Sequence, residues 1–199
     1  MQNNMTKAEK TRNFIVEKTA PIFNMKGYAG TSLNDITAAT GLTKGSIYGN
    51  FANKDEVALA AFDYNLKNVS STIDVEMNRQ SSIKDKLLVY ISIYQKFMDG
   101  SLSEGGCPVL NTAIDADDTH PELRGRVLKA VLDWKNKISK LVEAGIASKE
   151  INPDQNPKQI ALTIIAMVEG GIMISKLTSK TEYWNLIMGS LKKYVESLG

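Results

Sequence analysis

The chain has little of what most catalytic and extracellular proteins require. It contains one cysteine, Cys107, and one histidine, His120, among 199 residues. A single cysteine excludes an intramolecular disulfide framework, and no paired His or Cys spacing suits a zinc site. Neither a Ser-His-Asp order nor a Gly-rich phosphate loop after a strand is present. The sequence therefore indicates no catalytic residues, no metal site and no cofactor.

A large charge imbalance and a long apolar run are also lacking. The net charge is only +2, which excludes a protein that binds nucleic acid by bulk charge alone. The polar start, MQNNMTKAEKTRN, has no signal-peptide character. The most apolar run, residues 160–174, is interrupted by Glu169, Gly170 and Gly171 and is too short to span a bilayer. We expect a soluble, cytoplasmic protein with no membrane partner.

What the chain does have is helical periodicity. Hydrophobic residues make up 43% and charged residues 23%, as in globular domains. Apolar positions recur at helical spacing, and turn residues separate the segments. This pattern predicts an all-α fold of about nine helices. Their expected ranges are 7–26, 33–40, from 44 onward, 53–79, 83–98, 108–116, 121–145, 157–178 and 181–198.

The stretch TSLNDITAATGLTKGSIYGNFANK, residues 31–54, indicates two short helices joined by a tight turn. Gly41 ends the first helix, where a residue without Cβ strain allows a sharp exit. Thr43 is placed to cap the second helix, and Ile47 and Phe51 share its inner face. Helix, glycine turn and helix form the helix-turn-helix pattern, although an ordinary helical hairpin has the same elements.

The outer face of the second predicted helix is polar and suits contact with DNA. Residues 1–54 hold seven Lys or Arg against three acids, a local excess of +4, which also fits a solvated helix face. Hydroxyls, amides and lysines can contact phosphates, and the small glycines allow close approach of the backbone. The candidate DNA-binding residues are Thr31, Ser32, Thr43, Lys44, Gly45, Ser46, Tyr48, Gly49, Asn50 and Lys54.

The segment GYAGTSLNDITAATGLTKGSIYGNFANKDEV closely resembles the DNA-binding domain of the TetR family of transcriptional regulators. The matching features are Gly27-Tyr28, Thr31, Lys44-Gly45, Tyr48 to Phe51, and Lys54 with Asp55 and Glu56. Where many members carry an aromatic residue and a histidine, this chain has Gly49 and Asn50. The resemblance implies a three-helix helix-turn-helix domain at residues 1–53 and a ligand-binding and dimerisation domain at 54–199.

Residues 107–127, CPVLNTAIDADDTHPELRGRV, resemble the corresponding region of one subset of the same family. Within this segment, acidic residues gather around His120, which makes a divalent-metal site conceivable. Because they straddle a helix junction and no paired His or Cys spacing supports a metal, capping and solvation are the favoured explanation. Cys107 is open to two interpretations, a redox sensor or a small buried residue.

The last two predicted helices are apolar on more than one side. A single chain has too few elements to bury both, so we expect the pair to meet its copy as a four-helix interface, which is also the arrangement in the TetR family. Gly170 and Gly171 suggest a close helix approach. The candidate dimer-interface residues are Ile160, Ile164, Met167, Gly171, Ile174, Trp184, Ile187 and Leu191.

By resemblance, a small organic effector would bind between the C-terminal helices. The candidate contacts are Tyr90, Tyr94, Met98, Cys107, Asn111, Trp134, Met167 and Met173, although such side chains at helical spacing also form ordinary cores. The leading hypothesis is a dimeric repressor of a near-palindromic operator in double-stranded DNA, released by its effector. The alternatives are a small-molecule-binding protein and an architectural DNA-binding protein without ligand control.

Overall fold

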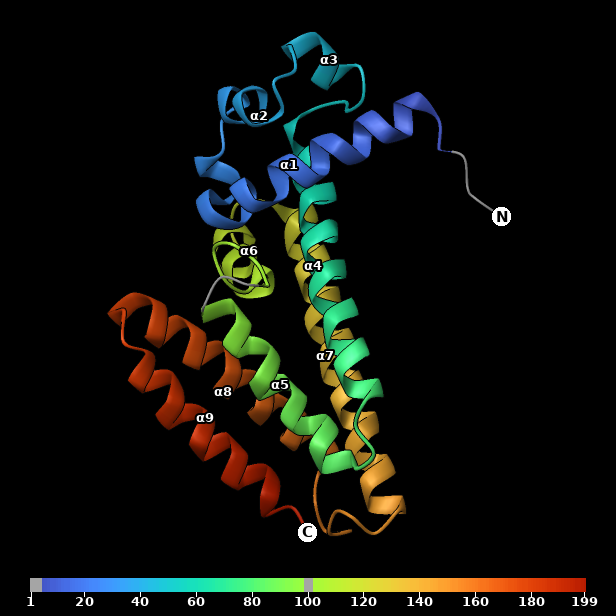
Figure 1. Ribbon diagram of the computed structural model, residues 1–199, viewed down its shortest axis with the longest axis vertical. Coiled ribbons are helices and arrows are strands. Elements are labelled where there is room, and N and C mark those ends of the chain that lie inside the picture. The colour runs from blue at the N-terminus through green and yellow to red at the C-terminus, as the bar shows by residue number, and fades with distance from the viewer. Residues whose placement is uncertain (1–4, 99–101) are drawn as a thin grey trace. The chain divides into compact units, whose positions relative to one another are not determined.

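The computed structural model describes residues 5–98 and 102–199, and the described chain is helical, without strands. The side chains of Tyr94, Gln95 and Met98 also lie outside the described part. In chain order the helices are α1 (Lys7–Gly30), α2 (Leu33–Thr40), α3 (Lys44–Tyr48), α4 (Lys54–Asn78), α5 (Ile83–Met98), α6 (Pro108–Ala116), α7 (Pro121–Ala147), α8 (Pro157–Thr178) and α9 (Thr181–Glu196) (Figure 1). The predicted all-α fold is confirmed.

The helices form two compact units. The first comprises Met1–Asn68 and Pro108–Val127, and the second comprises Val69–Cys107 and Leu128–Gly199. Helices α4 and α7 each begin in the first unit and end in the second. The first unit therefore contains α6 in addition to the predicted three-helix domain. The functional boundary after residue 53 stays a prediction.

Side-chain caps define the short helices of the first unit. Ser32 and Asp35 form a capping box at the start of α2, and the Gly41 N–H closes its end on Thr37 O. Gly41 has φ +66°, a left-handed conformation that favours glycine. Thr43 caps α3 by accepting from the Ser46 N–H. These caps lie where the sequence predicts them, because Ser and Thr hydroxyls satisfy the free N–H groups of a first turn.

Glycines mark the break in α1 and the end of α3. The regular geometry of α1 is interrupted at Gly27, which has φ +71° and ψ 177°, and one further turn follows to Gly30. Helix α3 has only five residues, because Gly49 is its C-cap and donates to Gly45 O. The chain therefore leaves α3 before Phe51, which is 2% exposed and packs into the core of the unit.

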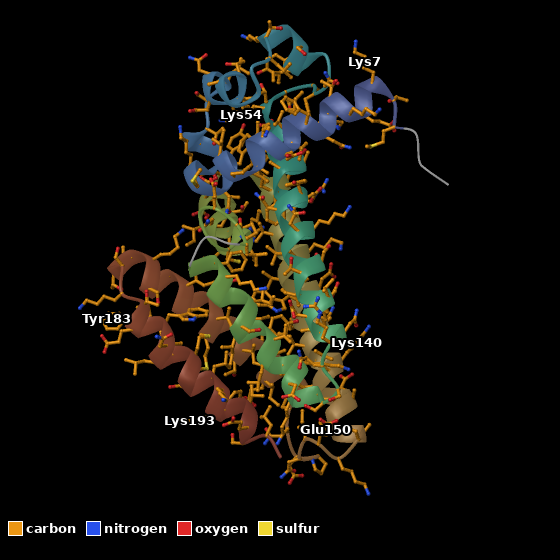
Figure 2. The ribbon with its side chains drawn as sticks, viewed as in Figure 1. Lys7, Lys54, Lys140, Glu150, Tyr183 and Lys193 are labelled. Atoms are coloured by element: carbon orange, nitrogen blue, oxygen red, sulfur yellow. The ribbon has the colours of Figure 1, made fainter. Side chains whose placement is uncertain are left out.

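The second unit is built from α5, α8 and α9 with the ends of α4 and α7. Figure 1 shows α8 and α9 side by side, with α5 packed against both. Gly171 lies at the contact of α8 with α9, where an added Cβ would be 3.1 Å from Met188 Cε and 3.2 Å from the Trp184 ring. In the turn after α7, Glu150 accepts a hydrogen bond from the Ile83 N–H at 2.7 Å (Figure 2).

Helix α8 is longer than its apolar run suggests. It has 22 residues and is the one helix of the described chain that is long and apolar enough to cross a membrane, by length and composition only. The run 160–174, expected to be too short to span a bilayer, lies within this longer helix, so its length alone does not exclude a span.

Most residues predicted at a dimer interface are already covered within one chain. Because α8 and α9 pack on each other, their largest apolar side chains face inward. Ile160, Ile164, Gly171, Trp184 and Leu191 are buried, whereas Met167 and Ile187 are half-buried and Ile174 is 37% exposed. The apolar side chains that remain exposed on these two helices are Leu162, Met173, Ile174, Leu177 and Leu186.

Candidate nucleic-acid interface

Helix α3 presents a polar face to solvent because its apolar side is buried. Ile47 is fully buried, so residues on the opposite side of the helix point away from the core. Tyr48 is 38% exposed. Five of the predicted DNA-binding residues here are exposed: Thr43, Lys44, Gly45, Tyr48 and Gly49. Ser46, in the same helix, is half-buried. These residues form one continuous polar surface at α3.

Thr31 and Ser32 have structural hydrogen bonds that the sequence did not reveal. Thr31 is fully buried, and its hydroxyl donates to Gly27 O at 2.7 Å, so its predicted role as a DNA contact is wrong. Ser32 is exposed, but its hydroxyl donates to Asp35 Oδ2 at 2.6 Å. Hydrogen bonds from Lys26 and Ser32 hold the pKa of Asp35 well below its usual range. Both residues therefore fix the entry into α2.

Asn50 and Lys54 are also held by neighbours. One side-chain N–H of Asn50 donates to Ser46 O at 2.9 Å, which fixes the direction of the amide against α3. The Lys54 ammonium lies 4.2 Å from the centroid of the Tyr28 ring, at the start of α4 (Figure 2). A cation over an aromatic face is attracted by the ring quadrupole. Lys54 therefore links α4 to α1.

Arg12 of α1 holds the turn between α3 and α4. Its guanidinium donates to Asn50 O and to Glu56 Oε1, each at 2.6 Å, and lies 4.0 Å from the centroid of the Phe51 ring. Hydrogen bonds from the Ala52 N–H and from Arg12 lower the pKa of Glu56. Arg12 is thus used to position α3. The sequence carries no local signal for this contact, because Arg12 and Glu56 are distant in the chain.

Tyr28 is the centre of a polar cluster that attaches α1 to α4 and α6. Its hydroxyl donates to Asp55, which raises the pKa of Tyr28 to about 12. Its backbone N–H donates to Asp115 Oδ2 at 2.6 Å, and the His120 ring meets its ring edge-on at 4.5 Å. An added Cβ at Gly27 would lie 2.8 Å from Asp115 Oδ1, so glycine is required there. We call Tyr28, Asp55, Asp115 and His120 the Tyr28 cluster.

The Tyr28 cluster explains part of the acidic segment around His120. His120 is 8% exposed, accepts from the Leu123 N–H at 3.2 Å and places Nε2 3.6 Å from Asp55. Among the residues that the structure describes, no group of three or more His, Cys, Asp or Glu side chains is arranged for a metal ion. Asp115 and His120 therefore have a structural role, which the sequence alone left open.

Asn111 was predicted to contact an effector, but it belongs to the first unit. Its side-chain N–H donates to Asn24 O at 3.0 Å, which ties α6 to α1. A small cavity of about 20 Å³ lies in the same unit, lined by residues of α1, α4, α6 and α7 that include Asn24, Asn65 and Asp115. This cavity has the size of a water site, not of an organic ligand.

The remaining predicted effector contacts belong to the second unit. Tyr90 is 1% exposed, and its ring centroid lies 5.8 Å from that of Trp134. Burial raises the pKa of Tyr90 above its ordinary range. Cys107 is buried against Glu169. Met167 is half-buried and Met173 is 47% exposed, whereas the side chains of Tyr94 and Met98 lie outside the described residues.

Two protein-family descriptions match the chain. Residues 15–61 match "Bacterial regulatory proteins, tetR family". Residues 84–191 match "Tetracyclin repressor-like, C-terminal domain". The first match contains α2, α3 and the start of α4, and the second contains most of α5 to α9.

Known proteins are similar along nearly the whole chain. A solved TetR-family transcriptional regulator from Cytophaga hutchinsonii is 47% identical, with a TM-score of 0.95 and 98% of each chain covered. The HTH-type transcriptional regulator YxaF from Bacillus subtilis is 33% identical over 88% of this chain and 90% of its own. The HTH-type transcriptional repressor DhaR from Mycobacterium sp. strain GP1 is 27% identical over 86% of this chain and 85% of its own.

Proposed function

The chain belongs to the TetR family of transcriptional regulators, and we propose that it is a repressor that binds a near-palindromic operator as a homodimer and is released by a small organic effector. DNA binding is supported chiefly by the exposed polar face of α3, which Arg12 and Phe51 hold in place. A recognition helix of this kind lies in the major groove. Repression is supported by the named function of the mycobacterial relative.

The exposed apolar side of α8 and α9 supports the dimer. Leu162, Leu177 and Leu186 are 52%, 84% and 62% exposed. Exposed apolar surface of this kind marks an interaction site. Since each five-residue α3 makes few contacts, two copies related by symmetry are needed to bind DNA tightly. We assign this face to a second copy of the chain in the cytoplasm and not to a lipid bilayer.

The Tyr28 cluster supports effector control of α3. Helix α6 and the first turns of α7 are attached to α1 through Asn111, Asp115 and His120. Helices α4 and α7 continue from these attachments into the second unit. An effector that changes their course there would change the separation of the two α3 helices in the dimer. Operator affinity would then fall without any change at the DNA-contact residues.

Selection of bound duplexes from a random pool by the full-length protein tests the function. We expect enrichment of a near-palindrome whose half-sites are separated by whole turns of the duplex. Failure to enrich any sequence, even at low salt, would favour a small-molecule-binding protein. An enriched site that no metabolite in a chemical library releases would favour an architectural DNA-binding protein.

A further inference from the structure

Glu169 is the only ionisable residue of α8 between Lys158 and Lys176. Glu169 is half-buried within the second unit, with its carboxyl group turned inward. The thiol of Cys107 donates to Glu169 Oε1 at 3.0 Å. The other oxygen, Oε2, is inaccessible to solvent and has no hydrogen-bond partner within the described chain. Because a buried carboxyl oxygen without a partner costs free energy, its presence in an apolar helix requires an explanation.

The contact of Glu169 with Cys107 is fixed by its surroundings. Lys176 lies two helical turns beyond Glu169, on the same side of α8, and donates to Gly105 O. Gly106 has φ +93°, and an added Cβ would be 3.2 Å from the Lys176 side chain. Residues 105–107 therefore lie along α8 and bring Cys107 to Glu169. This geometry directs the thiol at one carboxylate oxygen and leaves the other for a different partner.

Two other buried hydroxyls of the second unit, those of Ser175 and Tyr90, do not explain Glu169. Ser175 Oγ is one turn beyond Gly171, which contacts Trp184 of α9, so Ser175 belongs to the contact of α8 with α9. The Tyr90 hydroxyl lies on α5, whose Tyr90 ring packs beside Trp134. Of these three groups, only the Glu169 carboxyl is able to carry a charge near neutral pH. It therefore restricts the chemistry of a bound ligand more strongly than the two hydroxyls do.

We propose that the carboxylate of Glu169, oriented by Cys107, is the polar anchor of the effector site and binds the ammonium group of an organic amine. This inference rests on the proposed effector control. The thiol favours the ionised carboxylate by donating to it and leaves Oε2 as an acceptor. An ammonium group supplies both the missing donor and the opposite charge. A neutral hydroxyl supplies only the donor, and an anionic ligand would be repelled.

Burial also raises the pKa of Glu169 to about 7, and the Cys107 hydrogen bond acts in the opposite direction. The carboxyl group is therefore able to ionise near neutral pH when a cation is bound beside it. A carboxyl group that was merely structural would gain nothing from the charge of a ligand. This difference separates the two roles experimentally.

Binding of three compounds with one apolar body tests the proposal: 2-(1-naphthyl)ethylamine, 2-(1-naphthyl)ethanol and 1-naphthylacetate. Their affinities for the full-length protein are measured by calorimetry at pH 7.5, without DNA. We expect the amine to bind at least about tenfold more tightly than the alcohol, and the acetate to bind most weakly. In Glu169→Gln the amine and the alcohol should bind equally. Ser175→Ala, which removes another unpartnered polar group from the same helix, should retain the preference for the amine.

Equal affinity of the native protein for the amine and the alcohol, or no amine binding up to millimolar concentration, would overturn the proposal. So would an amine preference that persists in Glu169→Gln. The comparison within the native protein does not depend on the folding of any variant. Because DNA is absent from these measurements, a negative result leaves operator binding standing, whereas failure to select an operator would refute the proposed repressor without changing the amine preference.

Discussion

At the scale of single residues, exposure separates the side chains that we expect to contact DNA from those that hold α3 in place. Lys44 and Tyr48 are exposed on α3, whereas Thr31 is fully buried and bonded to Gly27 O. All three lie in one polar stretch of the sequence. Sequence patterns could not separate them, because the burial of Thr31 accompanies a break of α1 at Gly27, beside which the Tyr28 N–H donates to Asp115, far along the chain.

Lys44→Ala should weaken operator binding without changing the stability of the protein. Lys44 is exposed at the start of α3, where its charge suits a phosphate contact. Loss of one such contact per subunit reduces the slope of log affinity against log salt by about 0.9 per subunit. Fluorescence anisotropy with the selected operator at several salt concentrations measures the slope. An unchanged slope would contradict the placement of Lys44 on a phosphate.

Thr31→Val should show the reverse pattern. The variant keeps the shape of the side chain but removes the hydroxyl that donates to Gly27 O inside the protein. Loss of this buried hydrogen bond should lower the free energy of unfolding by about 1–2 kcal/mol. Operator affinity of the folded protein should stay within about twofold of native, since Thr31 cannot reach DNA from the interior. Urea denaturation and anisotropy give the two values, and a large loss of affinity with native stability would contradict the structural role.

Glu169→Gln should change how stability depends on pH. Burial raises the pKa of Glu169 from 4.5 to about 7, so between these values the folded protein binds a proton that the unfolded chain releases. Native stability therefore falls as pH rises through this window, by up to about 3 kcal/mol. The variant lacks this titration, so its free energy of unfolding should rise relative to that of the native protein from pH 5 to pH 8. Urea denaturation of both proteins at both pH values, without ligand, measures this rise. The same change of unfolding free energy with pH in both proteins would contradict the prediction.

At the scale of helices, the sequence predicted helix ends well where contacts between neighbouring residues determine them. The Thr43 cap and the glycine at 41, both expected from the sequence, set helix ends through contacts with residues three or four positions away. The attachments of α1 to α6 could not be predicted in this way. Tyr28 and Asp115 are separated by 87 residues, and neither lies in a pattern that indicates the other.

The two central glycines of α8 also show what periodicity cannot decide. Both were expected to admit a neighbouring helix, because α8 is apolar on nearly every side and no single face stands out. The structure places Gly171 against Trp184 and Met188, whereas an added Cβ at Gly170 meets nothing within 4 Å in the chain. Which side of such a helix faces its neighbour depends on the packing of α9, and the sequence of α8 does not encode it alone.

Gly171→Ala should destabilise the protein by about 1–3 kcal/mol, because its Cβ would lie 3.1–3.2 Å from Met188 and Trp184 of α9. Gly125→Ala is the matched control. Gly125 lies within α7 with nothing within 4 Å of an added Cβ, so the control should stabilise by up to about 1 kcal/mol through helix propensity. Thermal and urea denaturation measure both. Equal stabilisation by the two substitutions would mean that α9 does not approach α8 at Gly171.

At the scale of the whole molecule, the sequence indicated an excess of apolar surface but not which apolar residues stay exposed. The number of apolar positions on the last two helices exceeded what one chain could bury, and this excess led to the expected dimer. Trp184 and Leu191 were expected at the interface because they are large and apolar, yet each is 1% exposed within the single chain. The exposed residues are the ones left over after α8 and α9 pack together.

Leu177→Glu should therefore prevent dimerisation while leaving each subunit folded. Leu177 is 84% exposed on α8, so a carboxylate there costs the isolated chain little, but it would have to be desolvated in an α8–α9 interface. Val75→Glu, at a residue of α4 that is 52% exposed, adds the same charge away from these helices and should remain dimeric. Analytical ultracentrifugation gives the mass of each variant.

Because two α3 helices bind one near-palindrome, the monomeric variant should lose at least about a hundredfold in operator affinity, in proportion to the linkage of the two half-sites. A dimeric Leu177→Glu protein with native operator affinity would place the interface elsewhere.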